Sequence, residues 1–104
     1  ALGRLGVELV AGTNASIVSV LDGTVVLSTY TAEAGYVIAV QHTHDFMSIY
    51  KNCESLLKPV GESVKSGEVI GLAKKNTGEK KDIPVRFELW LKGRPVNPEN
   101  YIVF

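Results

Sequence analysis

The 104-residue chain has one cysteine, no excess of either charge and no long hydrophobic run. Cys53 alone cannot form an intramolecular disulfide, so nothing indicates a disulfide-stabilised fold. With 11 Lys+Arg against 11 Asp+Glu, the basic excess typical of nucleic-acid-binding domains is missing. No apolar run reaches the roughly 18 residues of a membrane-spanning helix. We therefore expect neither a nucleic-acid partner nor a membrane span within this chain.

Helical periodicity is also missing, because no window keeps apolar residues at helical spacing for three turns. Short apolar or alternating stretches are separated by turn-forming residues instead. This pattern predicts a single all-β domain over residues 1–104, a compact antiparallel sheet or sandwich of short strands with little or no helix. The chain begins abruptly in a patterned segment, so we expect it to be preceded by more of a longer protein. The expected strands cover residues 5–10, 17–21, 24–30, 36–42, 46–50, two short strands within 60–72, and 85–91.

The connections between these strands carry their own signals. Asp22-Gly23 tolerates positive φ and predicts a two-residue hairpin joining the strands before and after it. Residues 51–59 could hold a turn of helix or an irregular loop ended by Pro59. A turn is expected at Ser66-Gly67, and residues 76–82 are expected to form the longest exposed loop.

The strand at 85–91 alternates strictly in character. Val85, Phe87, Leu89 and Leu91 alternate with a polar and aromatic set, so the two sets occupy opposite sheet faces. The second set comprises Arg86, Glu88, Trp90 and Lys92. A strand of this kind can present Arg86 and Glu88 to a groove.

Three segments resemble one known family when they are taken together. They are residues 61–71 (GESVKSGEVIG), 87–90 (FELW) and 92–98 (KGRPVNP). The chain is similar to the lysostaphin-type, or LytM-like, peptidoglycan metallopeptidase domain, and the likeness runs through nearly the whole chain in the right order. The resemblance implies an antiparallel β core of the duplicated-hybrid-motif type with a groove.

The same resemblance implies a zinc site that this sequence does not carry. Active members bind zinc through a His-x-x-x-Asp motif and the second histidine of a late His-x-His pair. The first histidine of that pair and another histidine, which follows a Tyr-x element, assist catalysis. In this chain the five corresponding positions hold Arg4, Glu8, Asn52, Pro84 and Arg86.

These substitutions predict the loss of zinc and of hydrolytic activity. A guanidinium stays protonated and has no lone pair to offer a metal, so arginine both fails to bind zinc and repels it. As a hypothesis, Arg4 and Arg86 converge on Glu8 and form charge-assisted hydrogen bonds where the zinc would sit. Two arginines and one glutamate carry the same net charge as zinc and one aspartate.

Other residues offer weaker candidates. His42, His44 and Asp45 have metal-like spacing, and a His-x-His on a strand would place both imidazoles on one face. An incidental surface cluster is the alternative interpretation. Tyr50, Glu88 and Trp90 are possible groove residues, with the two aromatic rings stacking on sugar or peptide, although packing in the core or at an edge explains such rings equally.

The functional expectation rests on the resemblance. It implies an inactive cell-envelope domain that binds peptidoglycan or regulates a cell-wall hydrolase, with peptidoglycan, an envelope amidase or another envelope protein as partner, in the periplasm or outside the cell. One alternative is an active zinc endopeptidase cleaving peptidoglycan cross-bridges, with ligands from outside the chain or from His42, His44 and Glu8. Another is a purely structural role. Residues 60–71 are also similar to half of a biotinyl or lipoyl carrier domain, but Met47 has no lysine beside it, so no carrier lysine is predicted.

Overall fold

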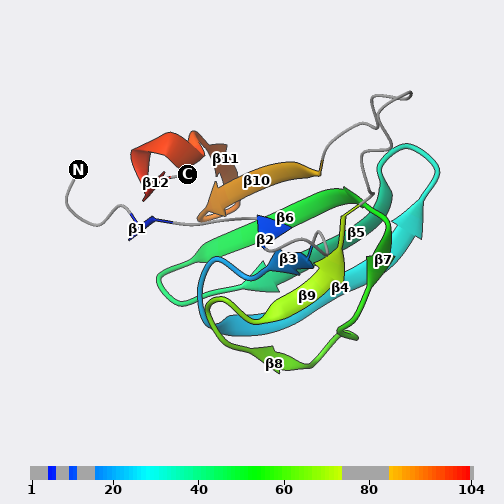
Figure 1. Ribbon diagram of the computed structural model, residues 1–104. Helices are drawn as coiled ribbons and strands as arrows, with labels where there is room; N and C mark the ends of the chain where they lie inside the picture. The colour runs from blue at the N-terminus through cyan, green and yellow to red at the C-terminus, as the bar shows by residue number, and fades with distance from the viewer. Residues whose placement is uncertain (1–4, 7–9, 12–15, 74–84, 104) are drawn as a thin grey trace.

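The structure, a computed structural model, describes residues 5–6, 10–11, 16–73 and 85–103. Twelve short strands and one turn of 3-10 helix occupy these residues (Figure 1). They are β1 (Leu5–Gly6), β2 (Val10–Ala11), β3 (Ser16–Val18), β4 (Gly23–Thr31), β5 (Gly35–Gln41), β6 (Phe46–Cys53), β7 (Ser55–Leu56), β8 (Ser63–Val64), β9 (Val69–Leu72), β10 (Arg86–Leu91), β11 (Arg94–Val96), η1 (Pro98–Asn100) and β12 (Ile102–Val103). The all-β prediction is confirmed.

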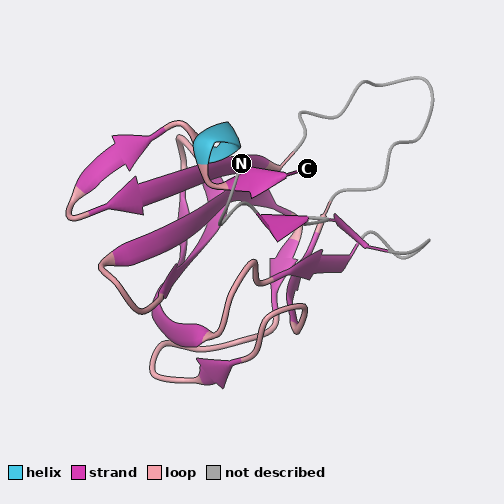
Figure 2. Ribbon diagram, turned by 90° about the vertical axis from the view of Figure 1, so that its left-hand side faces the viewer, coloured by secondary structure: helices cyan, strands magenta, loops and turns pink. Residues whose placement is uncertain are grey.

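The strands form three sheets. The largest has six strands in the order β11-β10-β6-β5-β4-β8, and its printed pairs are antiparallel. A second sheet has the order β2-β3-β9-β7 and is also antiparallel. The third is the parallel pair β1-β12, which brings segments from the two ends of the chain side by side (Figure 1). Figure 2 shows η1 as the one helical turn among strands and loops.

The hydrophobic core draws on both larger sheets. Ile17 of β3 and Ile70 of β9 pack in one cluster with buried residues of β4, β5, β6 and β10. Tyr50 and Leu89 are the large side chains that β6 and β10 contribute to it. Burying aliphatic groups of this size contributes about 1.5–3 kcal/mol each, so the core fixes the registers of both sheets.

Two strand predictions are confirmed in detail. Val37, Ile38, Ala39 and Val40 are all buried, as expected for a nearly continuous apolar run in a strand covered on both faces. The alternation of β10 is also present: Leu89 is buried and Phe87 packs against the core, while Arg86 on the opposite face is exposed.

The predicted Asp22-Gly23 hairpin is wrong. β3 pairs with β2 and β9, whereas β4 pairs with β5 and β8, so Asp22 and Gly23 connect two different sheets. Gly23 is not among the positive-φ residues. A β-carbon at Gly23 would lie 2.3 Å from the Gln41 carbonyl oxygen and 2.8 Å from His42 Nδ1. Close approach of β5, and not turn geometry, is what requires glycine there.

Several boundaries also differ from those expected. β6 extends to Cys53 and is followed by β7, so residues 51–56 are strand and not a turn of helix. β8 and β9 flank a turn at Ser66-Gly67 as predicted, but they belong to different sheets. The loop predicted for residues 76–82 lies outside the described residues. Within the described part of the chain, no helix is long and apolar enough to cross a membrane.

Candidate functional site

The outward side of β6 and β10 carries the described residues that the sequence nominated for a site. Arg86, Glu88 and Trp90 project from β10 on the face opposite Leu89. The strand register places Lys51, Ile49 and Met47 of β6 directly opposite them, in that order. We call these six residues the β6–β10 face.

Glu88 is the centre of the polar contacts on this face. Its Oε2 lies 2.7 Å from the ammonium nitrogen of Lys51. Its Oε1 accepts a hydrogen bond of 3.0 Å from the indole Nε1–H of Trp90. Both carboxylate oxygens are therefore engaged, and the Trp90 ring is held against the strand that carries it.

These contacts set the protonation state of Glu88. The hydrogen bond from Lys51, followed by that from Trp90, lowers the pKa of the Glu88 carboxyl below its ordinary value, against an opposing effect of burial. A carboxylate with a lowered pKa remains ionised and is a weak proton acceptor at neutral pH. Glu88 therefore suits an electrostatic and positioning role better than general-base catalysis.

Arg86 occupies the end of the face nearest the other nominated positions. Its side chain is exposed, and Lys51 lies opposite it in the strand register. Among the residues that the structure describes, none forms an ion pair with Arg86. Arg4, Glu8 and Pro84 lie outside the described residues, so the ion-pair cluster of Arg4, Glu8 and Arg86 remains a prediction.

Asn52 is held in an unusual backbone conformation at the end of β6. Its φ is 64°, in the left-handed region that asparagine tolerates better than most residues. Its backbone N–H donates a 2.7 Å hydrogen bond to the Ala34 carbonyl. A β-carbon on Gly35 would come within 3.2 Å of the Asn52 Oδ1, so this side chain packs beside the β4–β5 connection.

The groove-stacking role predicted for Tyr50 is wrong. Tyr50 is fully buried, and its ring packs against Phe87 with the centroids 5.4 Å apart. Its hydroxyl oxygen accepts a 3.0 Å hydrogen bond from the Val20 N–H. Burial raises the pKa of the Tyr50 phenol, so it remains protonated. Tyr50 connects the two sheets and is inaccessible to a ligand.

His42 and His44 do not share a strand face, which corrects the geometry expected of a His-x-His pair. His42 is buried, whereas His44 is exposed in a turn with a φ of 60°. His42 Nδ1 lies 2.8 Å from the Asp22 carbonyl oxygen, which can only accept, so Nδ1 carries the proton. His42 Nε2 then accepts from the Ser48 hydroxyl at 2.7 Å.

Both nitrogens of His42 are thus committed to hydrogen bonds inside the protein. Burial lowers the pKa of the His42 imidazole, which favours the neutral form. No lone pair is left for a metal. The described residues contain no group of three or more His, Cys, Asp or Glu side chains placed to hold one.

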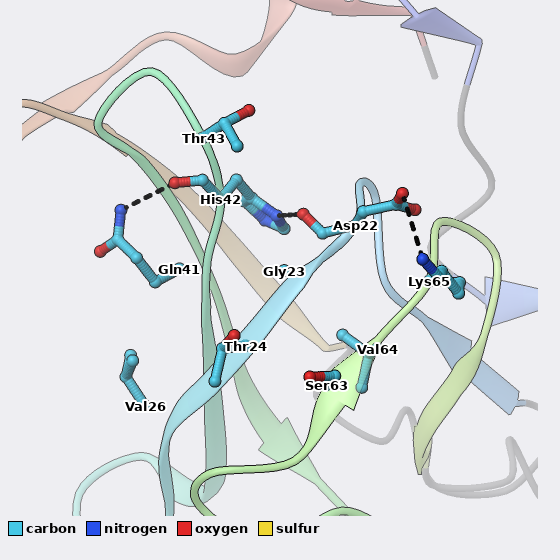
Figure 3. A pocket seen from close by; sticks show the side chains of 10 residues that line it. All are labelled: Asp22, Gly23, Thr24, Val26, Gln41, His42, Thr43, Ser63, Val64 and Lys65. Carbon is cyan, nitrogen blue, oxygen red and sulfur yellow. Dashed lines mark hydrogen bonds and ion pairs between the residues drawn. The ribbon is translucent and has the colours of Figure 1, made fainter.

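A pocket of about 510 Å³ lies away from the β6–β10 face (Figure 3). It is lined by Asp22, Gly23, Thr24, Val26, Gln41, His42, Thr43, Ser63, Val64 and Lys65. The Asp22 carboxylate accepts a 2.7 Å hydrogen bond from the Ser66 N–H and lies 4.0 Å from the Lys65 ammonium. The charged groups at this pocket are therefore used in tying the β3–β4 connection to the β8–β9 turn.

Comparisons with known proteins place this geometry in a family. A model of peptidase family M23 matches residues 3–98. The chain belongs to this family. The predicted resemblance is therefore confirmed, and the β6–β10 face lies within the matched domain.

Individual relatives include hydrolases and hydrolase activators. The chain is 36% identical over 76 residues to the peptidoglycan DD-endopeptidase ShyA of Vibrio cholerae, covering 73% of this chain and 17% of that protein. It is 29% identical over 97 residues to the murein hydrolase activator EnvC of Escherichia coli, covering 93% of this chain and 23% of that protein. This chain therefore corresponds to only a small part of either relative.

A solved structure shows the same fold in an assembly. The SpoIIQ–SpoIIIAH pore-forming complex matches with a TM-score of 0.75 and 30% identity, covering 85% of this chain and 56% of that chain. A zinc-containing peptidase from Vibrio cholerae matches with a TM-score of 0.69 and 26% identity, covering 85% of this chain and 27% of that chain.

The described residues at the family's metal position do not fit zinc. Arg86 offers no lone pair, and the one carboxylate beside it, Glu88, is already bound by Lys51 and Trp90. Sequence reasoning missed Lys51 in this arrangement. No short motif could reveal it, because its contact with Glu88 depends on the register between β6 and β10.

Proposed function

We propose that this domain is a non-hydrolytic member of the M23 family that works in the cell envelope, by binding peptidoglycan or by controlling a cell-wall hydrolase. The observation that carries the proposal is Arg86. It stands on β10 where active relatives place a metal-binding histidine, and it is exposed beside a carboxylate that other side chains already hold. A permanent cation at that position is incompatible with a catalytic zinc.

The rest of the β6–β10 face suits recognition. Glu88 stays ionised beside the cationic Lys51 and Arg86, while the half-buried Trp90 supplies an aromatic surface fixed by its indole hydrogen bond. Aromatic rings with a fixed orientation beside paired charges are frequent at binding surfaces because little conformational entropy is lost on binding. The face thus offers carbohydrate or peptide a rigid contact.

The relatives support an envelope role without fixing the partner. EnvC is a murein hydrolase activator, ShyA is a peptidoglycan endopeptidase, and SpoIIQ is seen in a complex with SpoIIIAH. A domain with this fold and without metal ligands fits the activator and assembly roles better than the endopeptidase role. The specific envelope partner, the absence of bound zinc and the compartment are part of this proposal.

The test combines metal analysis, digestion and binding. The purified chain should retain no stoichiometric zinc and should release no peptides from purified peptidoglycan. Sedimentation with insoluble peptidoglycan should recover the chain, and Trp90→Ala should weaken this recovery more than Tyr101→Ala, a change of another aromatic residue outside the face. Bound zinc together with released peptides would show instead that the domain is an active endopeptidase.

If the chain neither digests nor binds peptidoglycan, the hydrolase-control arm is examined directly. A purified amidase from the same envelope would be assayed on peptidoglycan with and without the chain. A change in amidase rate that Arg86→Ala abolishes is the expected result. An unchanged rate, together with no binding to peptidoglycan, would leave only a structural role and would overturn the proposal.

A further inference from the structure

The exposed large hydrophobic side chains of the described residues gather along one edge of the six-stranded sheet. They are Val26, Leu27, Tyr30, Tyr36, Leu57 and Val60, with exposed fractions between 41% and 62%. Scattered single hydrophobic residues are ordinary on a protein surface, but a contiguous group marks an interaction site. The grouping therefore calls for a functional explanation.

Contacts on the page join these six residues through β4. Val26, Leu27 and Tyr30 belong to that strand. The Tyr36 ring packs edge-to-face against Tyr30, with the centroids 5.0 Å apart.

Leu57 and Val60 lie on the segment that is bonded to β4. The Ser28 hydroxyl donates to the Lys58 carbonyl at 2.9 Å, and the Gly61 N–H donates to the Val25 carbonyl at 2.8 Å. We call the six hydrophobic residues, together with the backbone of residues 26–31, the β4 edge surface.

The backbone of β4 is only partly paired on its outer side. β8 pairs with Gly23 and Thr24, and residues 61 and 62 exchange hydrogen bonds with Val25. Past Val25, the described strands provide β4 with a partner only on its other side, in β5. Alternate residues of an antiparallel strand point their N–H and C=O groups away from the paired neighbour, so this edge presents unpaired backbone groups.

Other edges of the two larger sheets are protected in ways that β4 is not. β11 ends the six-stranded sheet with Arg94 and Pro95, and proline removes a backbone donor. β2 and β7 end the four-stranded sheet and have two residues each. Residues 26–31 contain no charge, no proline and no glycine, and they read Val-Leu-Ser-Thr-Tyr-Thr.

The electrostatics of this edge favour an uncharged partner. The nearest cation on the adjoining segment, Lys58, is 2.8 Å from the Glu68 carboxylate, which compensates its charge. A charged strand laid against β4 would lose hydration without finding an opposite charge on the strand itself. The surface is therefore complementary to an extended, uncharged segment rich in β-branched or aromatic residues.

We propose that the β4 edge surface is a docking site at which a second protein adds an extended segment as a strand beside β4. Main-chain hydrogen bonds to residues 26–31 supply affinity, and the exposed hydrophobic side chains select alternate residues of the added strand. The proposal deepens the proposed function, and rests on it, by naming a protein-docking surface that is separate from the β6–β10 face.

A different protein suits this surface better than a second copy of the chain. The Lys58 carbonyl occupies the side chain of Ser28, so the stretch of edge clear of that segment is residues 29–31. Two copies pairing through three residues each would form too short a ladder for a stable dimer. A flexible partner segment can instead run past the hairpin end and also cover Leu57 or Val60.

The test uses a capped peptide of alternating threonine and valine as the probe. Amide hydrogen exchange of the 104-residue chain, followed residue by residue, should slow for the outward-facing amides of residues 26–31 when the peptide is added. A peptide with proline at its centre should give no protection. Absence of protection with the first peptide, or equal protection with both, would overturn the proposal.

Two matched variants sharpen the test. Thr29→Lys places a charge on the open part of the edge, whereas Thr24→Lys places the same charge on an exposed threonine of β4 that is paired on both sides. Thr29→Lys should abolish the protection and Thr24→Lys should retain it, with wild-type thermal unfolding in both. Equal behaviour of the two variants would count against the edge.

Sedimentation of the free chain identifies the competing occupant. Concentration-dependent dimers that Thr29→Lys removes would show that the surface joins two copies, and this would overturn the assignment to a second protein. The outcome is separable from the proposed function. Zinc-dependent digestion by a chain that still protects residues 26–31 would overturn only the non-hydrolytic proposal, whereas missing protection in an inactive chain would overturn only this docking site.

Discussion

The ammonium group of Lys51 lies 2.7 Å from Oε2 of Glu88, joining the two strands that carry the candidate site. The pair is diagonal in the strand register, since Lys51 is opposite Arg86 and Glu88 is opposite Ile49. Glu88 is thereby drawn into a stable structural contact at the place where the M23 fold would otherwise support metal chemistry. The same pair leads to a first prediction.

Replacing Lys51 with methionine should raise the pKa of the Glu88 carboxyl towards its ordinary value, because the largest stabilising hydrogen bond is lost. The free energy of unfolding should fall by no more than about 1 kcal/mol, the usual limit for a solvent-accessible ion pair. The lowered folded-state pKa contributes stability above the unfolded pKa, and this contribution is lost as the pH falls through the folded value.

Carboxyl NMR titration of Glu88 measures the effect of this change. Lys65→Met is the control, since Lys65 is 4.0 Å from Asp22 and is far more exposed. An unchanged Glu88 titration in Lys51→Met would show that Trp90 and Arg86 alone hold the carboxylate ionised.

Gly23→Ala should destabilise the fold by about 1–3 kcal/mol, the range for overpacking in a well-packed interior. The new methyl group would meet the Gln41 carbonyl oxygen at 2.3 Å, and a backbone atom cannot move aside as a flexible side chain can. Urea unfolding of the variant and the wild type gives the difference. Gly93→Asn is the control, because Gly93 has a φ of 76° that asparagine tolerates and open space around it. Equal stability of the alanine variant and the wild type would contradict the close approach of β4 and β5.

Stability should fall between pH 7.5 and pH 5.5 because of His42. Burial lowers the pKa of this imidazole below 6.5, so the unfolded chain takes up a proton before the folded chain does. The contribution of His42 is therefore full above the unfolded pKa and declines as the pH falls towards the folded value. Urea unfolding at the two pH values measures the change.

Two histidine variants separate this effect from general acid sensitivity. His42→Gln should be less stable at pH 7.5 by about 0.5–1.5 kcal/mol for each hydrogen bond lost, and should lose less stability than the wild type on acidification. His44→Asn keeps a residue that tolerates the positive φ in the exposed turn and should retain the wild-type pH response. A pH response that survives in His42→Gln would argue against the buried neutral imidazole.

The sequence predicted what depends on local pattern and missed what depends on strand pairing. The buried run of β5 and the alternation of β10 follow from side-chain periodicity alone, and both are correct. Asp22-Gly23 was misjudged because its composition fits a tight hairpin, whereas the glycine is needed for contact with a strand about twenty residues further along.

The candidate site divides in the same way. Arg86, Glu88 and Trp90 were placed correctly on one face, because they alternate along a single strand. Tyr50 was assigned to the groove, but its position in β6 directs it into the core between the sheets. The ion pair with Lys51 and the exposed edge of β4 become visible only once neighbouring strands are known.

Restoring the family's metal ligands should restore zinc binding, and a single restoration should not. Zinc in a catalytic site takes three protein ligands and one water, so Arg86→His alone provides too few donors. The triple variant Arg4→His, Glu8→Asp, Arg86→His supplies the implied ligand set and should bind one zinc per chain, as measured by titration calorimetry and native mass spectrometry. Adding Asn52→His and Pro84→His should be required before peptides are released from peptidoglycan, because the implied catalytic histidines are still missing in the triple variant. Zinc bound by the wild type or by Arg86→His alone would show that other residues of this chain form a metal site.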